Sequence, residues 1–144
     1  EYRYRIDAGP VPDPFTARYA WHRPGTYRLA AMRRAAALLV GEHDFASFCR
    51  APRGGGHTVR TLRRLSVRRD GDRLEIRALA GGFLHQMVRS LVGTLVWVGA
   101  GRMEAEAMTE ILAARSRNGT PQMAPPHGLC LVTVQYDVRA RGRE

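Results

Sequence analysis

The stretch TVRTLRRLSVRRDGDRLEIRALA, residues 58–80, decides the fold of this 144-residue chain. Apolar residues such as Val67 and Ile76 alternate with arginine and glutamate on the two sides of Asp70-Gly71. Alternation with a period of two is typical of a half-buried strand, and Asp-Gly is a strong signal for a tight hairpin turn. The stretch therefore predicts a β-hairpin with an apolar face and an arginine-rich face.

Helix-forming patterns flank the hairpin on both sides. The run LAAMRRAAALLV, residues 29–40, is rich in helix formers and is followed by Gly41, a residue type that often ends helices. Residues 84–100 are mostly apolar or small and predict a buried helix, which is too short to cross a membrane and carries Arg89. Residues 104–116 predict a further helix, acidic at its start and basic at its end, as the helix dipole favours.

Strands are predicted near both ends of the chain. The opening YRYRI, residues 2–6, alternates tyrosine and isoleucine with arginine, and GLCLVTVQYDV, residues 128–138, predicts a last strand. The resulting order β-α-β-β-α-α-β predicts an α+β fold, a mainly antiparallel sheet with helices packed on one face. We expect residues 1–138 to form one α/β unit and residues 139–144 to be a frayed basic tail.

The composition indicates a polyanionic partner. The chain carries 23 basic residues, all of them arginine, against 13 acidic ones, and its formal net charge is +10. An excess of this size favours nucleic acid as the partner. The two cysteines, Cys49 and Cys130, occur in no paired motif, which predicts free buried thiols in a reducing, cytoplasmic compartment. The five histidines have no metal-ligand spacing with them, so no metal site is predicted.

Arg89 is the residue that calls for a partner within the apolar stretch. In the predicted helix it shares a face with His85, four residues before it, and Gly93, four residues after it. Glycine lowers helix stability by up to about 1 kcal/mol relative to alanine, so Gly93 indicates that another segment approaches closely there. Two roles for Arg89 are open. It forms a structural ion pair with a carboxylate such as Glu75, or it is an active-site arginine that holds a catalytic carboxylate or a phosphate.

Four blocks of the sequence resemble the tRNA pseudouridine synthase A family. They are EYRYRI (1–6), GEHDFASFC (41–49), FLHQMVRSLVGTLVWVG (83–99) and MAPPHGLCLVTVQYD (123–137). Together they resemble the C-terminal half of that family. The resemblance implies a pseudouridine-synthase-like fold and a homodimer that acts on tRNA without a cofactor. It also implies the reaction, which isomerises uridine to pseudouridine at positions 38–40 of the anticodon stem-loop.

The resemblance also implies roles for particular residues. Arg89 matches the family arginine that pairs with the catalytic aspartate and keeps its carboxylate ionised. Tyr2 matches the tyrosine that packs on the flipped base and takes the proton from C5, and Leu129 matches an apolar residue that lines the same pocket. His85 is expected to contact substrate there or to satisfy a hydrogen bond beside Arg89. At Ser90 the sequence departs from the asparagine that usually follows the arginine.

The nucleophile itself is expected to lie outside this chain. The family signature Arg-Thr-Asp-Ala-Gly does not occur in the 144 residues. Because the chain opens within a strand pattern, we expect the signature upstream of Glu1 and expect this chain alone to be inactive. Asp44 in GEHDF is expected to cap the turn that follows it and not to act as the nucleophile. The alternative to an enzyme is a non-catalytic RNA-binding module that retains the fold.

The arginines of the predicted hairpin suggest a surface for RNA. In one interpretation they follow the tRNA phosphates and so read the shape and backbone of the RNA. In the other they form only a solvated strand face, and the sequence leaves both interpretations open. The residues concerned are Arg60, Arg63, Arg64 and Arg68.

Overall fold

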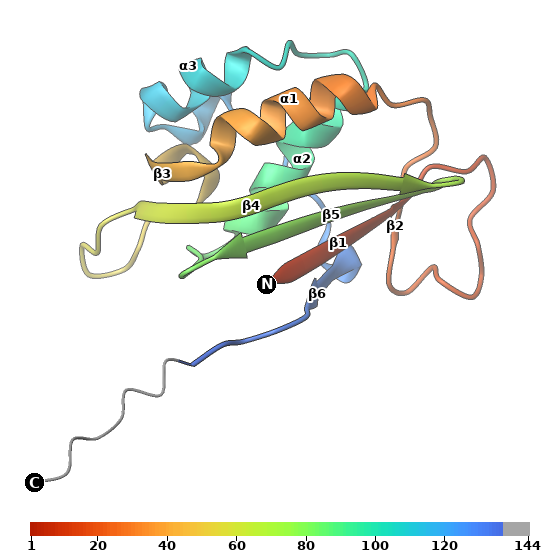
Figure 1. Ribbon diagram of the computed structural model, residues 1–144, viewed down its shortest axis with the longest axis horizontal. Helices are drawn as coiled ribbons and strands as arrows, with labels where there is room; N and C mark the ends of the chain where they lie inside the picture. The colour runs from red at the N-terminus through yellow and green to blue at the C-terminus, as the bar shows by residue number, and fades with distance from the viewer. Residues whose placement is uncertain (137–144) are drawn as a thin grey trace, which may run out of the picture.

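Three α-helices cover one face of a six-stranded sheet in the computed structural model, which describes residues 1–136 (Figure 1). The predicted α+β class, a mainly antiparallel sheet with helices on one face, is confirmed. The predicted tail, 139–144, and the end of the predicted last strand lie outside the described residues. The helices are α1 (Leu29–Leu39), α2 (Met87–Gly99) and α3 (Ala107–Ala114), with 3₁₀ turns η1 (Ala46–Phe48), η2 (Arg117–Gly119) and η3 (Pro126–Gly128).

The predicted hairpin forms the centre of the sheet. β4 (Val59–Asp70) pairs antiparallel with β5 (Arg73–Ala80), and Val67 lies opposite Ile76. Gly71 reverses the chain with a φ of +57°, a left-handed conformation that glycine adopts at little cost. The larger apolar side chains of both strands are mostly buried beneath the helices, while most of their arginines are exposed.

β1 (Tyr2–Asp7) lies beside β5 and pairs with two short strands along its other edge. β6 (Leu129–Leu131) runs antiparallel to the first half of β1, and β2 (Trp21–His22) runs parallel to its last two residues. The strand order is therefore β2-β1-β5-β4-β3, with β6 also on β1. The strand predicted over 128–138 is shorter than expected in the described part of the chain, since only Leu129–Leu131 is assigned to it.

Two strands were not predicted, because each depends on its partner more than on its own pattern. β2 has only two residues, and β3 (Gly41–Asp44) forms where the chain returns from α1 to the edge of β4. Gly41 makes that return with a φ of +112°. The prediction that α1 ends just before Gly41 is confirmed to within a residue.

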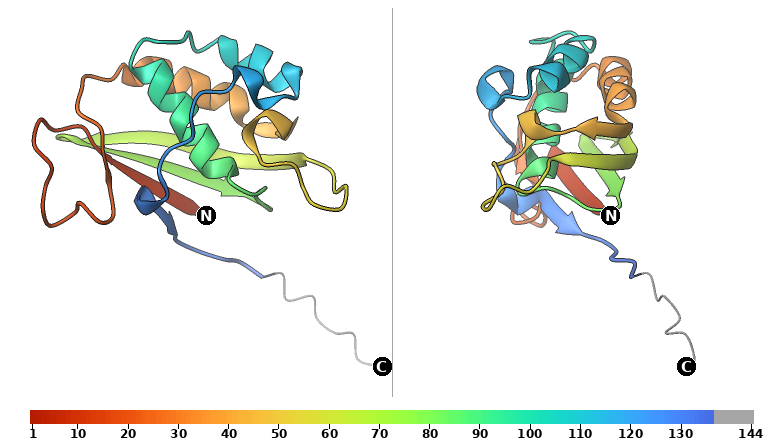
Figure 2. Two further views of the ribbon diagram at one scale, coloured as in Figure 1. Left: turned by 180° about the vertical axis from the view of Figure 1, so that it is seen from behind. Right: turned by 90° about the vertical axis from the view of Figure 1, so that its left-hand side faces the viewer.

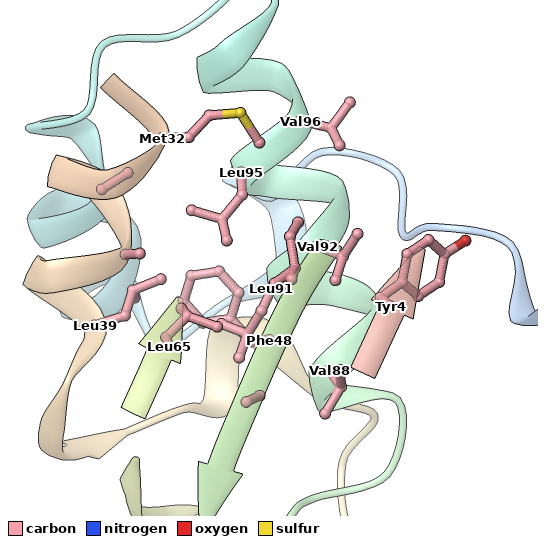
Figure 3. Packing of buried hydrophobic residues seen from close by; sticks show 14 of the residues in the cluster. Tyr4, Met32, Leu39, Phe48, Leu65, Val88, Leu91, Val92, Leu95 and Val96 are labelled. Carbon is pink, nitrogen blue, oxygen red and sulfur yellow. The ribbon is translucent and has the colours of Figure 1, made fainter. Parts of the chain in front are cut away.

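The core lies between the helices and the sheet. Side chains of α1 and α2, among them Met32, Leu39 and Leu95, point toward one another above the strands (Figure 3). Cys49 is buried in this core as predicted. Cys130 is exposed, because it lies opposite Arg3 and so points to the face of the sheet that has no helices. Within residues 1–136, no helix is long and apolar enough to cross a membrane.

Candidate active site

Four residues that the sequence analysis singled out line one pocket near the start of α2. The pocket has a volume of about 580 Å³, and Tyr2, His85, Arg89 and Leu129 all contribute to its wall. Tyr2 begins β1, Leu129 begins β6, and the other two come from the turn before α2 and from its first turn. Segments far apart in the sequence therefore meet here. The remaining lining residues are Phe83, Leu84, Gln86, Met87, Val88 and Pro126.

Arg89 is half-buried and is held from one side only. Its Nε donates a hydrogen bond of 2.8 Å to the carbonyl oxygen of Ala124, whose own N–H donates to the carbonyl of Arg89 at 3.0 Å. Among residues 1–136, no carboxylate lies within 4.0 Å of its guanidinium, and its Nη groups have no protein acceptor. The Nη groups are not among the buried atoms that lack a partner, so they remain accessible from the pocket and available to an anion brought from elsewhere.

The alternative in which Arg89 pairs with Glu75 is wrong. The alternation of β5 turns Ile76 toward the core and Glu75 toward the face of the sheet that has no helices. There the carboxylate of Glu75 pairs with Arg77 at 2.7 Å and lies 3.8 Å from Nε of Arg5. This acidic group is therefore already occupied on the opposite side of the sheet.

The partner of Arg89 belongs to a connecting segment, residues 121–128, which we call the strap. The strap runs alongside α2 on its way from α3 to β6 (Figure 2, left). It lies so close to the helix that a Cβ at position 93 would overlap the carbonyl oxygen of Gln122 and lie 3.1 Å from Cα of Met123. The close approach predicted from Gly93 is confirmed, and the approaching segment is the strap.

Tyr4 holds the strap from the side of the sheet. Its side chain is fully buried, and its hydroxyl donates a hydrogen bond of 2.6 Å to the carbonyl oxygen of Pro125. Burial raises the pKa of this hydroxyl above its ordinary value, and the nearby Arg89 guanidinium offsets part of the rise. The hydroxyl therefore stays protonated and remains a donor. A Cβ at Gly128 would lie 2.6 Å from the Tyr4 ring, so glycine is needed where the strap reaches β6.

Aromatic and apolar side chains form the other wall of the pocket. Tyr2 is half-buried and meets the edge of Phe83 with the ring centroids 5.0 Å apart and the planes at 83°. Leu129 lies opposite Tyr4 in the β1–β6 register, which turns it to the same face of the sheet as Tyr2. The sequence analysis missed Phe83 and Pro126, although both lie inside the blocks that resemble the family.

His85 is not on a helical face with Arg89, which corrects the prediction. α2 begins at Met87, and Gln86 has a left-handed backbone with a φ of +63°. The chain therefore bends between His85 and Arg89, and the His85 side chain is exposed. The two residues still line the same pocket, but the turn brings them there and helical periodicity does not.

The four predicted arginines of the hairpin do not form one row. Arg60 lines a hollow of about 510 Å³ that shares Phe83, Leu84 and His85 with the pocket. The register of β4 against β5 shifts between Leu62 and Arg64. The other three arginines border different hollows. Arg63 and Arg64 border a hollow beside Glu1, with Arg64 3.5 Å from its carboxylate, and Arg68 borders one beside Arg5.

Asp44 takes the capping role that was predicted for it. Its Oδ1 accepts a hydrogen bond of 3.1 Å from the N–H of Ala46, the first residue of η1, and another from the hydroxyl of Thr58. The hydrogen bond from Thr58 is the main cause that holds the pKa of this carboxyl below its usual range. Asp44 does not line the pocket. Within residues 1–136, no three His, Cys, Asp or Glu side chains are grouped so that they could hold a metal ion.

Comparisons with known proteins identify the family. A family model described as tRNA pseudouridine synthase matches residues 35–137. The chain is 47% identical over 135 residues to tRNA pseudouridine synthase A of Moorella thermoacetica, a match that covers 94% of this chain and 55% of that protein. It is 44% identical over 129 residues to the protein of the same name from Halalkalibacterium halodurans, which covers 90% of this chain and 49% of that one.

A third relative gives the same result. The chain is 46% identical over 136 residues to tRNA pseudouridine synthase A of Brevibacillus brevis, covering 94% of this chain and 56% of that protein. The chain therefore belongs to the tRNA pseudouridine synthase family. It spans about half the length of the curated relatives that it matches.

Proposed function

We propose that this chain forms one wall of the active site of an enzyme that isomerises uridine to pseudouridine in the anticodon stem-loop of tRNA, at positions 38–40. The observation that carries the proposal is the state of Arg89. Its Nε is used on the carbonyl of Ala124, while among residues 1–136 its Nη groups have no acceptor and no carboxylate is near. Family membership supports the class of reaction.

The reaction moves the base without adding a group. The bond from C1′ to N1 of uracil breaks, the base turns over, and C5 bonds to C1′; C5 then loses a proton and N1 gains one. The family aspartate acts at the sugar and must be ionised to do so. Arg89 favours the ionised form because a nearby guanidinium lowers the pKa of a carboxylate. With Nε anchored, both Nη groups remain for a two-pronged contact with that carboxylate.

The pocket suits a base that has left its stack. At about 580 Å³ it falls within the range of small-molecule sites. Tyr2, Phe83 and Leu129 supply apolar and aromatic surface for the flipped uracil, as base-flipping enzymes require. Tyr2 is the group that we assign to take the proton from C5. His85 stands at the exposed rim, where it contacts the incoming nucleotide.

Other expectations belong to the same proposal. The nucleophile signature does not occur in the 144 residues, so the chain by itself is expected to form no pseudouridine. The enzyme acts as a homodimer in the cytoplasm and needs no cofactor or metal. Arg60 contacts tRNA from the hollow that adjoins the pocket, whereas Arg63, Arg64 and Arg68 contact tRNA at a distance from it.

The proposal is tested with Arg89→Lys in the protein as its gene encodes it. Lysine keeps the positive charge but loses both the Nε bond to Ala124 and the planar fork. We expect the single-turnover rate of pseudouridine formation to fall by at least about 100-fold. The dissociation constant for tRNA should change by less than about threefold, because most of the affinity comes from phosphate contacts elsewhere.

Arg33→Lys is the matched control. Arg33 also donates through Nε to a main-chain carbonyl, that of Val67 at 3.0 Å, but it does not line the pocket. Arg33→Lys therefore controls for the structural effect of losing a hydrogen bond from Nε to a main-chain carbonyl. A well-folded Arg89→Lys protein with a rate like that of the control would overturn the catalytic role of Arg89. A rate that only follows the folded fraction, measured by thermal melting, would reduce Arg89 to a structural residue.

A further inference from the structure

A second hollow adjoins the pocket and has no role in the chemistry above. It has a volume of about 940 Å³ and shares Gln86, Arg89 and Pro126 with the pocket. The strap forms part of its wall. Its other distinctive side chains are two tryptophans and three arginines, and we call the hollow the Trp–Arg groove: Trp21, Arg23, Trp97, Arg102 and Arg117.

Trp97 is in an unusual position on α2. Every other residue of this helix except Arg89 is buried, so the helix presents only a tryptophan and an arginine to the groove. The Cζ of Arg102 lies 5.6 Å from the centroid of the Trp97 ring, close enough for a cation–π contact. Trp97 is only partly buried, so part of its ring remains open to the groove, where it can stack with a ligand.

Trp21 stands on β2 and is held in place before any ligand arrives. Its ring meets Tyr4 edge-on, with centroids 6.4 Å apart and planes at 89°. The Cζ of Arg23 lies 5.8 Å from the Trp21 ring, and Nη1 of Arg23 donates to the hydroxyl of Tyr27 at 2.8 Å. The aromatic ring and the guanidinium are therefore ordered by contacts within the protein.

The charge of the groove favours a polyanion. None of its lining residues is acidic, although four of them, counting Arg89, are arginines. Proteins that bind single-stranded nucleic acid combine planar aromatic rings with guanidinium groups, because bases stack on the rings and phosphates pair with the cations. The groove and the pocket also share Gln86, Arg89 and Pro126 as lining residues, so a strand whose uridine enters the pocket would have its neighbouring nucleotides near the groove.

We propose that the Trp–Arg groove binds the RNA strand next to the target uridine. Bases stack on Trp21 and Trp97, and phosphates pair with Arg23, Arg102 and Arg117. This inference rests on the proposed function, because it takes the pocket as the place of the target uridine. It assigns part of the RNA contact to residues that the hairpin hypothesis does not include.

The tryptophans supply the readout, because both tryptophans of these 144 residues line the groove. Unmodified tRNA is titrated into the protein as its gene encodes it, and tryptophan fluorescence is followed. We expect quenching on binding and a smaller quench in Trp97→Phe. The part of the quench that disappears in Trp97→Phe is the part assigned to the groove. The dissociation constant should rise about tenfold in Trp97→Ala, the loss of one stacked base. Arg102→Ala should lower the slope of log Kd against log salt by about 0.7–0.9.

Arg34→Ala is the matched control for charge. Arg34 is an exposed arginine of α1 that lies 3.7 Å from Glu106 and does not line the groove. If Arg102→Ala and Trp97→Ala, each shown to be folded by thermal melting, bind tRNA like this control, the groove does not hold RNA. Since Arg102 is exposed, its variant keeps the test valid even if Trp97→Ala fails to fold.

Failure of the inference can be distinguished from failure of the proposed function. The proposed function is tested by pseudouridine formation in the unaltered protein. The inference about the groove is tested by tRNA binding in the variants. If the unaltered protein forms pseudouridine and the groove variants bind tRNA with an unchanged dissociation constant, only the proposal for the groove is overturned. In another outcome tRNA quenches the fluorescence and binds tenfold more weakly to the variants, but the unaltered protein forms no pseudouridine. This outcome supports RNA binding in the groove and overturns the proposed enzymatic function. If tRNA binds without quenching the tryptophan fluorescence, RNA is overturned as the occupant of the groove.

Discussion

At the scale of single residues, Arg89 is best compared with Arg77. Both guanidinium groups are partly buried, but Arg77 has two carboxylate partners, Glu75 at 2.7 Å and Glu1 at 3.4 Å. Arg89 has a main-chain carbonyl alone within the described part of the chain. A neutral acceptor fixes the direction of the side chain but leaves its charge unbalanced. Arg77 is therefore structural, and Arg89 has the features of a binding group.

Asp44 yields a prediction about pH. Its carboxylate accepts hydrogen bonds from Thr58 and Ala46, which hold its pKa below the ordinary value of about 3.9. A lowered pKa in the folded state means that ionised Asp44 stabilises the fold above the unfolded pKa. This stabilisation disappears as the pH falls through the lowered folded pKa. We expect Asp44→Ala to reduce the free energy of unfolding by about 1–2 kcal/mol at pH 7.

Urea unfolding between pH 7 and pH 2.5 checks this prediction. The difference between Asp44→Ala and the unaltered protein should shrink once the pH drops below about 4, as the carboxylate is protonated. Asp70→Ala is the control, because Asp70 is an exposed carboxylate at the hairpin turn. A difference that stays constant over the whole range would show that the ionised form of Asp44 contributes nothing.

At the scale of elements, the strap and α2 behave as one unit. The strap is bonded to the helix through Arg89 and to β1 through the Tyr4 hydroxyl. Between these points Gly93 allows the two backbones to touch. Because α2 is buried almost everywhere, it cannot shift to make room, and the strap must move instead.

Gly93→Ala is therefore expected to be destabilising although alanine favours helices. The added methyl group would overlap the carbonyl oxygen of Gln122, and overpacking of this kind typically costs about 1–3 kcal/mol. The melting temperature should fall. In the active protein, the rate of pseudouridine formation should fall by more than the loss of folded molecules explains, because the strap that holds Arg89 is displaced.

Gly119→Ala gives the comparison for that change. A Cβ at Gly119 meets nothing within 4 Å, so the substitution should change the free energy of unfolding by less than about 0.5 kcal/mol. Thermal melting of both variants decides the matter. If Gly93→Ala is as stable as Gly119→Ala, the strap yields easily and does not position Arg89.

At the scale of the whole molecule, the two faces of the sheet differ in kind. The helical face holds the core, with the pocket at its margin. The face without helices holds a mixture of arginines and carboxylates, in which Glu75 and Glu1 offset part of the positive charge. The formal charge of +10 is therefore unevenly distributed, and hollows lined by arginine without acidic groups lie beside the pocket.

The hairpin arginines can be tested at this scale. Changing Arg63, Arg64 and Arg68 together to alanine should lower the slope of log Kd for tRNA against log salt by about two to three units if each contacts a phosphate. The same number of charges removed from the region of α1, at Arg28, Arg33 and Arg34, is the control. An equal slope in the two triple variants and the unaltered protein would identify the hairpin as a solvated face.

Much of the fold could be predicted because its pattern is local. The alternation around Asp70-Gly71 contains both strands of the central hairpin and their turn. The helix formers before Gly41 contain α1 almost to the residue. The turn at Gln86 could not be predicted, since an apolar run carries no signal for a left-handed residue. Nor could β2 or β3, which are too short to show a period and form only against β1 and β4.

The candidate site divides in the same way. The sequence by itself determined that Arg89 stands in an apolar helix and that Tyr2 and Leu129 belong to strands. Only the tertiary structure decided that these three line one pocket, that Glu75 is not the partner of Arg89, and that the strap is. The bonds that settle this join residues 35 apart, for Arg89 and Ala124, and 121 apart, for Tyr4 and Pro125. Periodicity reports the state of a segment and its neighbours within a few residues, whereas a hydrogen bond over such separations exists only when the whole chain has packed.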